Sequence, residues 1–442
     1  MNGRSFDTFI ARFRELASAL PDKRTGDNSR YAMADFALAA FSVFFTQCPS
    51  FLSFQENMEK TQGRNNGRSL FGIERIPCDN QIRLMLDPSP PELLFPLYDQ
   101  LRKAFDQAGL LEAMRAVHGT QLIAMDGTWH FSSQAESIHC PGCSRVHHAN
   151  GKITHFHSAI TPVVVSPGFW QVVPLRPEFI RPQDGVEKQD CEINAAKRWL
   201  AANAERYSAG NATLLGDDIY ARQPFCRQAA LHGFHYIFTC KPSSHTWLSG
   251  WVQGLKPGEG ISVLNQRVKG KGNRFELQQY RWANAVPLTG EEDPLKANWL
   301  EVTVTDGEGK VLYRNSWITD WEVTAANVAG LAAAGRARWK IENEHNNVLK
   351  TKGYHLEHNF GHGKQHLANL LLALNILAFG LHTLLEVSDE SYRLIRGAVG
   401  SRRKFFQHLE AVTAYWFFQN WEALMDFMMR GQEVGPYAPQ KS

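Results

Sequence analysis

The segment Leu122-Ile123-Ala124-Met125-Asp126 is an apolar run that ends in a carboxylate. A short apolar run bounded by turn residues is typical of a buried β-strand. A second run of this kind, Thr213-Leu214-Leu215-Gly216, ends at Asp217. Because ligands of open α/β sheets gather at the carboxyl ends of strands, the two acids predict a site at one edge of a sheet. A single aspartate after a strand is more often a turn or capping residue, so the pair matters more than either member.

The segments around these two runs alternate between strand and helix patterns. Strands are expected at 121–131, 155–165, 169–175, 212–220 and 236–240, and helices at 190–207 and from Pro224 to near Gly233. This order predicts an α/β domain. The sequence predicts five regions: a helical N-terminal region (1–118), the first part of an α/β core (119–242), a β-rich insertion (243–318), the second part of that core (319–385) and a C-terminal helical region (386–442).

Composition excludes several classes of protein. The 442 residues carry a formal charge of only +3, so a nucleic-acid surface would need clustered basic residues. Seven scattered cysteines and an N-terminus without an apolar segment indicate a reducing compartment, the cytoplasm, rather than secretion. The apolar stretch 367–385 is interrupted by Asn369, Asn375 and His382, which favours a buried core helix over a membrane span.

A third acid, Glu342, lies in a long helical segment that starts near Val323. At about 100° per residue, Arg338, Glu342 and Asn346 share one side of that helix, whereas Glu344 points about 200° away from Glu342. An Arg338–Glu342 pair could be only a stabilising helix contact. Two strand-end carboxylates with a third from a helix can, however, hold a pair of divalent cations that drive in-line attack on a phosphodiester.

The three acidic motifs and their order resemble those of DDE transposases of bacterial insertion sequences. The matching pieces are Ala124-Met125-Asp126-Gly127-Thr128, Leu215-Gly216-Asp217-Asp218-Ile219-Tyr220 and Arg338-Trp339-Lys340-Ile341-Glu342-Asn343-Glu344. The chain is most similar to the cut-and-paste group that has a Tyr-Arg-Glu-Lys signature at its last acid and a β-rich insertion before it. The resemblance covers roughly residues 119–385.

This resemblance implies that residues 119–242 and 319–385 form an RNase H-like catalytic core, that the helical region 1–118 binds DNA, and that the chain carries out a transposase reaction. Asp126, Asp217 and Glu342 would hold Mg²⁺ or Mn²⁺, and Arg338 and Lys350 would contact DNA phosphates. A nick at the transposon end would free a 3′-hydroxyl, which then attacks target DNA. A homo-oligomer would pair the two terminal inverted repeats in the bacterial cytoplasm. The chain departs from the signature because Gly335 replaces the Tyr, and Lys350 lies one residue beyond the expected position, Leu349.

Two basic, glycine-rich segments predict further phosphate contacts. In Arg267–Arg274 the candidates are Lys269, Lys271 and Arg274, at the tip of an expected hairpin. The segment Lys60–Arg68 reads as a loop. The alternative for both segments is a solvated loop.

A Cys-x2-Cys pair, Cys140 and Cys143, is half of a zinc-binding pattern. His148 is the candidate third ligand for a structural zinc, and His147, His155 and His157 lie nearby. The later cluster His355, His358, His362 and His366 fits no zinc hydrolase spacing, which favours DNA contacts or caps for it.

The sequence is also compatible with three other functions: a nuclease of the same core that makes no strand transfer, a non-catalytic DNA-binding protein derived from a transposase, and a zinc-stabilised structural protein.

Overall fold

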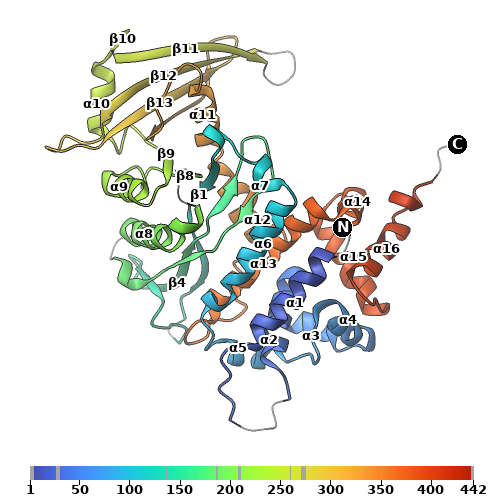
Figure 1. Ribbon diagram of the computed structural model, residues 1–442. Helices are drawn as coiled ribbons and strands as arrows, with labels where there is room; N and C mark the ends of the chain where they lie inside the picture. The colour runs from blue at the N-terminus through green and yellow to red at the C-terminus, as the bar shows by residue number, and fades with distance from the viewer. Residues whose placement is uncertain are drawn as a thin grey trace.

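The computed structural model describes residues 4–25, 30–135, 137–185, 188–207, 211–258, 260–269 and 275–439. It is a mixed α/β structure with one long sheet, whose central strands lie between helices. Figure 1 shows an extended β-rich part at the top, a central α/β part, and a helical part that contains both ends of the chain.

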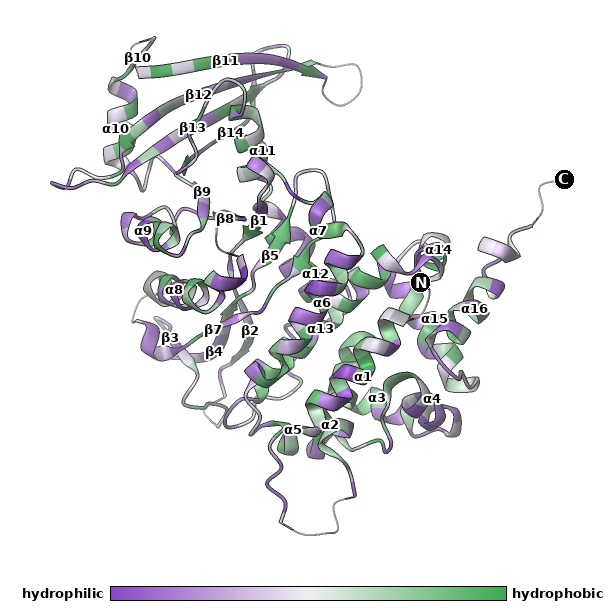
Figure 2. Ribbon diagram, in the orientation of Figure 1, coloured by the Kyte–Doolittle hydropathy of each residue, from purple (hydrophilic) through white to green (hydrophobic). Residues whose placement is uncertain are grey.

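The centre of the molecule is built on the two apolar runs of the sequence. Strand β1 (Gln121–Ala124) lies between β8 (Ala212–Gly216), which is parallel to it, and β5 (Val163–Val165), which is antiparallel. Strand β9 (His235–Thr239) continues the sheet parallel to β8, and β6 (Val173–Pro174) closes the other edge. β1 and β8 are buried along their whole length, as parallel strands covered by helices require. In Figure 2, β5 is hydrophobic, and β1 is hydrophobic after its first residue, Gln121.

The strand predicted over 121–131 is divided in the structure. β1 stops at Ala124 and a second strand, β2 (Gly127–Ser133), starts after Met125 and Asp126. β2 pairs with β4 (Ile153–Ile160), which also pairs with β3 (Ser144–His147) and β7 (Glu178–Ile180) in a smaller sheet. The interruption therefore places Asp126 at the junction of the two sheets.

The region 243–318 extends the central sheet. Its first element is a helix, α10 (Thr246–Gly254), where the sequence predicts β structure. The strands that follow are β10 (Lys256–Pro257), β11 (Gly260–Lys269), β12 (Phe275–Pro287), β13 (Lys296–Thr305) and β14 (Val311–Thr319). β14 pairs antiparallel with β9, so the β-rich region is continuous with the core sheet.

Two groups of helices cover the central strands. Helices α8 (Lys188–Tyr207) and α9 (Gln223–Leu231) lie on one side, close to the positions predicted for them. On the other side lie α6 (Phe95–Gln107) and α13 (Leu367–Ser388), both of which contact β6 (Figure 1). Among the described residues, α13 is the one helix long and apolar enough to cross a membrane, but 89% of its apolar window is buried within the protein. It is therefore a core helix here, as the sequence indicates.

The N-terminal and C-terminal helices pack together around α13 and α2. The N-terminal set is α1 (Arg4–Ser18), α2 (Met33–Phe45), α3 (Phe51–Met58), α4 (Thr61–Phe71), α5 (Asp79–Leu86), η1 (Pro91–Leu94), α7 (Leu110–Ala113) and η2 (Val117–Gly119). The C-terminal set is α14 (Glu390–Val399), α15 (Arg402–Tyr415), α16 (Trp421–Gly431) and η5 (Gly435–Tyr437). A further short helix, η3 (Pro182–Asp184), precedes α8. Stacked aromatic rings of Phe6 and Trp421, 4.3 Å apart, join the two ends of the chain.

The expectation of a basic loop at 60–68 is wrong. These residues form most of α4, and Gly63 is buried against the backbone of Asn57 and Met58, where a Cβ would clash. Asn66 is fully buried and donates to the carbonyl oxygens of Thr413 and Trp416. The glycines therefore permit close helix packing rather than a phosphate contact.

Candidate functional site: a carboxylate cluster and a Cys/His group

The register of β1 and β8 places Asp126 and Asp217 side by side. Ala124 is paired with Leu215, and the Met125 N–H donates to the Leu215 carbonyl oxygen at 2.9 Å. Each aspartate follows its paired residue by two positions. Because the two strands are parallel, both carboxylates leave the sheet at the same edge.

Glu342 comes from a π-helix, η4 (Ile341–Asn346), between α11 (Val328–Arg336) and α12 (Asn347–Thr351). The Arg338 Nη2 donates to the Glu342 Oε1 at 2.7 Å. From the same π-helix, the Asn346 Nδ2 lies 3.4 Å from the Asp126 Oδ2. The Asn346 Oδ1 accepts a hydrogen bond of 2.9 Å from the Thr161 hydroxyl. Asn346 thus fixes this helical turn against the end of β1, and π-turns are frequent at functional sites.

A fourth acid, Glu192 on α8, lies beside these residues and was missed by sequence reasoning. It is 6% exposed, and its Oε1 accepts a 2.7 Å hydrogen bond from the Tyr220 hydroxyl. A Cβ at Gly127 would lie 2.6 Å from the Glu192 Oε2, so glycine is needed beside Asp126. One clue was available: Glu192 lies four residues before Ala196 and seven before Trp199, on the apolar side of its helix.

The four carboxylates interact electrostatically. Burial, together with the negative charges of Glu192, Glu342 and Asp217 and against the positive charge of Arg338, raises the pKa of Asp126 to about 7. The pKa of Asp217 is also raised, mainly by burial, against a hydrogen bond from the Ile219 N–H and the charge of Arg338. Three acids raise the pKa of Asp126 through their charge, and one cation, Arg338, lowers it. A bound cation would relieve this excess.

The acids act on one another electrostatically, but no three of them converge closely. Among the described residues, the acidic side chains form no group in which three ligand atoms all lie within 4.8 Å of each other. Mutual repulsion favours this spacing, and Arg338 already neutralises Glu342. Asp218 is directed elsewhere: its carboxylate accepts from the Lys241 N–H at 2.6 Å and lies 3.4 Å from the His245 Nε2.

The departure from the transposase signature at Gly335 has a structural explanation. Gly335 on α11 faces the fully buried Trp317, whose Nε1 would lie 2.6 Å from a Cβ at this position, so no Tyr side chain fits. Lys350 pairs with the exposed Glu357 at 3.2 Å. Lys340, two residues after Arg338, is buried and donates to the Ser166 carbonyl oxygen at 2.6 Å. This hydrogen bond ties the helix to the loop after β5.

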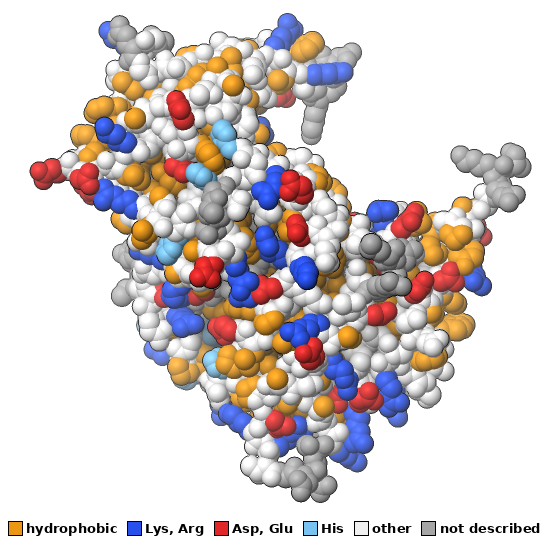
Figure 3. Space-filling model, in the orientation of Figure 1, with side chains coloured by type: hydrophobic (Ala, Val, Ile, Leu, Met, Phe, Trp, Pro, Cys, Tyr) orange, Lys and Arg blue, Asp and Glu red, His pale blue; other side chains and the backbone are white. Residues whose placement is uncertain are grey.

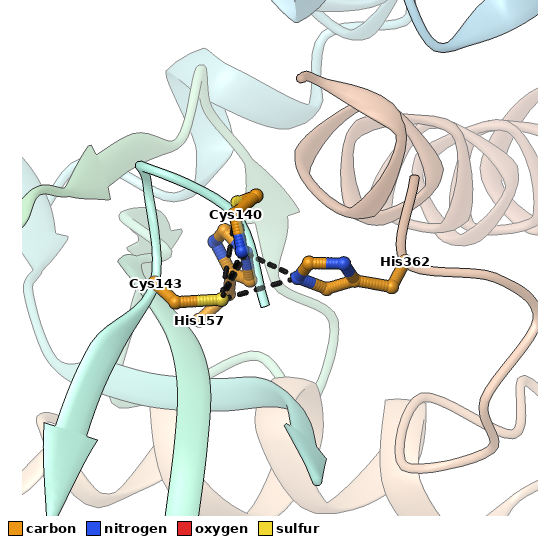
Figure 4. A group of neighbouring side chains, drawn as sticks. All are labelled: Cys140, Cys143, His157 and His362. Carbon is orange, nitrogen blue, oxygen red and sulfur yellow. Dashed lines mark hydrogen bonds between the residues drawn. The ribbon is translucent and has the colours of Figure 1, made fainter. Parts of the chain in front are cut away.

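The second cluster contains Cys140, Cys143, His157 and His362 (Figure 4). All four ligand atoms lie within 4.8 Å of one another, which no other described group of three or more such residues achieves. His148, the candidate from the sequence, is not a member; its Nε2 lies 2.7 Å from the Thr154 hydroxyl instead. His362 is a member, although the sequence favoured a capping or DNA-binding role for it.

The predicted basic tip at 267–274 is described only in part. Lys269 is exposed at the end of β11, and Lys271 and Arg274 lie outside the described residues. On the face of the molecule in Figure 3, Lys and Arg side chains are interspersed with Asp and Glu. This face therefore offers no single basic patch, in keeping with the formal charge of +3.

Comparison of the chain with models of known protein families and with curated proteins finds no match. The two sites therefore provide the evidence for function.

Proposed function

We propose that this chain is a DDE transposase that cleaves and joins DNA in the presence of Mg²⁺ or Mn²⁺. The observation that carries the proposal is the placement of Asp126 and Asp217 at the ends of two neighbouring parallel strands, with Glu342 brought to the same carboxylate cluster by a helix. The open mixed sheet β6-β5-β1-β8-β9, covered by helices on both sides, suits the RNase H-like core that the resemblance implies. The strands of 260–319 correspond in position to its β-rich insertion.

The donor set fits a hard divalent cation. Carboxylate oxygens are the ligands that Mg²⁺ prefers, and Mg²⁺ keeps several waters, so a few acids suffice. Burial, and after it the neighbouring negative charges, raises the pKa of Asp126, and a bound cation would oppose both effects. When bound, the metal would polarise the phosphodiester and favour ionisation of the attacking oxygen.

The residues of the chain would each contribute to the reaction. Asp126, Asp217 and Glu342 would hold the cation, and Asn346 would keep Asp126 in position. Arg338 holds Glu342 in the resting protein and is free to turn to a phosphate once a cation replaces it. Lys350, Lys269, Lys271 and Arg274 are proposed as phosphate contacts outside the acidic site. Their contribution would weaken as salt rises.

One geometry serves both chemical steps of the proposed reaction. In the first, a water oxygen attacks the phosphorus at the element's end, and the bond to the 3′-oxygen breaks. In the second, that freed 3′-hydroxyl attacks a phosphodiester of target DNA, forming one P–O bond and breaking another. Two copies of the chain would hold the two DNA ends together, as the resemblance implies.

The test uses labelled duplexes made from the inverted repeats that flank the coding region. The full-length chain is expected to nick them with Mg²⁺ and to join the new 3′-ends to target DNA. Asp126→Asn, Asp217→Asn and Glu342→Gln should each lower both activities by at least about 100-fold, as loss of one ligand or transition-state contact does. Glu344→Gln is the matched control, since it alters a neighbouring acid on the same π-helix, and it should retain activity.

The outcomes separate the rival functions. Nicking without joining would indicate a nuclease with this core. DNA binding without either activity, unchanged by Asp126→Asn, would indicate a non-catalytic DNA-binding protein and would refute the proposal.

A further inference from the structure

The Cys/His group joins two parts of the chain that are far apart in sequence. His157 lies on β4, Cys140 and Cys143 lie in the turn just before β3, and His362 lies in the loop before α13, more than 200 residues later. Figure 4 shows His362 directed across the gap toward the other three side chains. All four residues are buried, with exposures of 4–9%.

The distances between the four ligand atoms are those of a tetrahedral zinc site. Zinc–sulfur bonds of about 2.3 Å and zinc–nitrogen bonds of about 2.0–2.1 Å give tetrahedral edges of about 3.8 Å for S–S, 3.5 Å for S–N and 3.3 Å for N–N. The two Sγ atoms here are 3.8 Å apart. The His157 Nε2 is 3.4 Å from each Sγ, the His362 Nε2 is 3.1 Å from the Cys143 Sγ, and the two Nε2 atoms are 3.2 Å apart.

The surroundings of the ligands also suit a metal. The His362 Nδ1 lies 2.7 Å from the Gly363 carbonyl oxygen, so this nitrogen is the donor and the Nε2 presents its lone pair. The Cys140 N–H points to the Cys143 Sγ at 3.4 Å, and the Cys143 N–H donates to the Cys140 carbonyl oxygen at 3.0 Å. These contacts form the tight turn that lets both sulfurs of a Cys-x2-Cys pair reach one ion.

The loop that carries His362 is itself fixed. The carboxylate of Asp87, just after α5, accepts hydrogen bonds of 2.9–3.2 Å from the N–H groups of residues 364–367, at the start of α13. Gly361 and Gly363 have positive φ angles, +142° and +71°, that an L side chain rarely adopts. The chain therefore holds His362 in place independently of a metal.

We propose that Cys140, Cys143, His157 and His362 bind one structural zinc ion. Two thiolates and two imidazoles in tetrahedral positions suit Zn²⁺, and four protein ligands leave no open position for catalysis. The ion would fasten the β2–β4–β3 sheet to the start of α13. β2 begins directly after Asp126, and the loop of His362 follows the helices that carry Glu342, so the zinc would brace both sides of the carboxylate cluster. The inference stands independently of the proposed reaction.

The metal content of the purified full-length chain tests the proposal. We expect about one zinc per chain by plasma mass spectrometry. Cys143→Ser and His362→Ala should reduce it at least about tenfold, since each removes one of four ligands. His148→Ala and Cys78→Ser are the matched controls, a histidine and a cysteine outside the group, and they should retain the zinc.

A second measurement uses the wild type alone, so it does not depend on whether the variants fold. Wild-type chain grown with Co²⁺ in place of Zn²⁺ should show the visible bands of tetrahedral cobalt together with thiolate charge-transfer absorption. A wild-type chain that contains neither zinc nor cobalt would overturn the proposal. Full zinc content in both Cys143→Ser and His362→Ala would also overturn it.

Discussion

Asp126 is the residue on which the acidic site depends most. It lies where β1 ends, and burial with the charges of Glu192, Glu342 and Asp217 raises its pKa to about 7, from an ordinary value of 3.8. Between these two pH values the carboxyl keeps its proton in the folded chain and loses it in the unfolded chain. The stability that this group contributes is therefore fully present below pH 3.8 and is lost as the pH rises through about 7.

This pKa predicts how stability depends on pH when magnesium is absent. Between pH 5 and pH 8 the free energy of unfolding of the wild type should fall relative to that of Asp126→Asn, by roughly 2 kcal/mol. Urea titrations of both proteins in magnesium-free buffer measure the difference. Added Mg²⁺ should restore the wild type at pH 8 and leave the variant unchanged. If the free energy of unfolding changed with pH in the same way in both proteins, the pKa of Asp126 would not be raised, and the prediction would be wrong.

Site residues that belong to a short sequence pattern could be predicted, whereas residues that only the tertiary fold brings together could not. Asp126 and Asp217 end apolar runs, and Glu342 has Arg338 four residues before it, so short windows of sequence contain the relevant pattern. Glu192 has no such marker except its place on the apolar side of α8. His362 is more than 200 residues from Cys143, and the tertiary fold, including the packing of α13 against β2, brings them together.

At the scale of elements, close packing accounts for several departures from the sequence patterns. Helix α11 contacts β9 and β13, and its Gly335 lies against the indole of Trp317 on β14. Periodicity predicts a helix here but contains no information on how near the next strand lies. The same holds for α4, where Gly63 and Gly67 resembled loop residues but are buried in a helix. The π-turn of η4 likewise has no marker in the sequence that periodicity detects.

The contact between Gly335 and Trp317 predicts a large effect of one methyl group. Gly335→Ala should lower the free energy of unfolding by roughly 1–3 kcal/mol, because a Cβ would lie 2.6 Å from the indole nitrogen and Trp317 is fully buried. The control is Gly330→Ala on the same helix, where a Cβ meets nothing within 4 Å. That change should be neutral or stabilise by up to about 1 kcal/mol through helix propensity. Equal effects at both positions, measured by thermal unfolding, would refute the packing argument.

At the scale of the whole molecule, the sheet and the helical part meet at α13. The apolar composition of 367–385 predicts this core helix, and it is buried between α2, α6 and β6. The alternation of strands and helices over 119–242 likewise predicts the α/β centre. The joining of the N-terminal and C-terminal helices was beyond sequence patterns, because contacts such as Asn66 with Thr413 span about 350 residues and have no periodic trace.

The proposed function requires that the carboxylates of Asp126, Asp217 and Glu342 share a bound cation. Iron-dependent hydroxyl-radical cleavage tests it most directly, because Fe²⁺ bound in place of Mg²⁺ cuts the backbone only nearby. With zinc-loaded full-length chain, we expect cuts near residues 126, 217 and 342 together, suppressed by excess Mg²⁺ and absent in Asp126→Asn. Cuts confined to one of these positions, or unchanged by Asp126→Asn, would contradict the account.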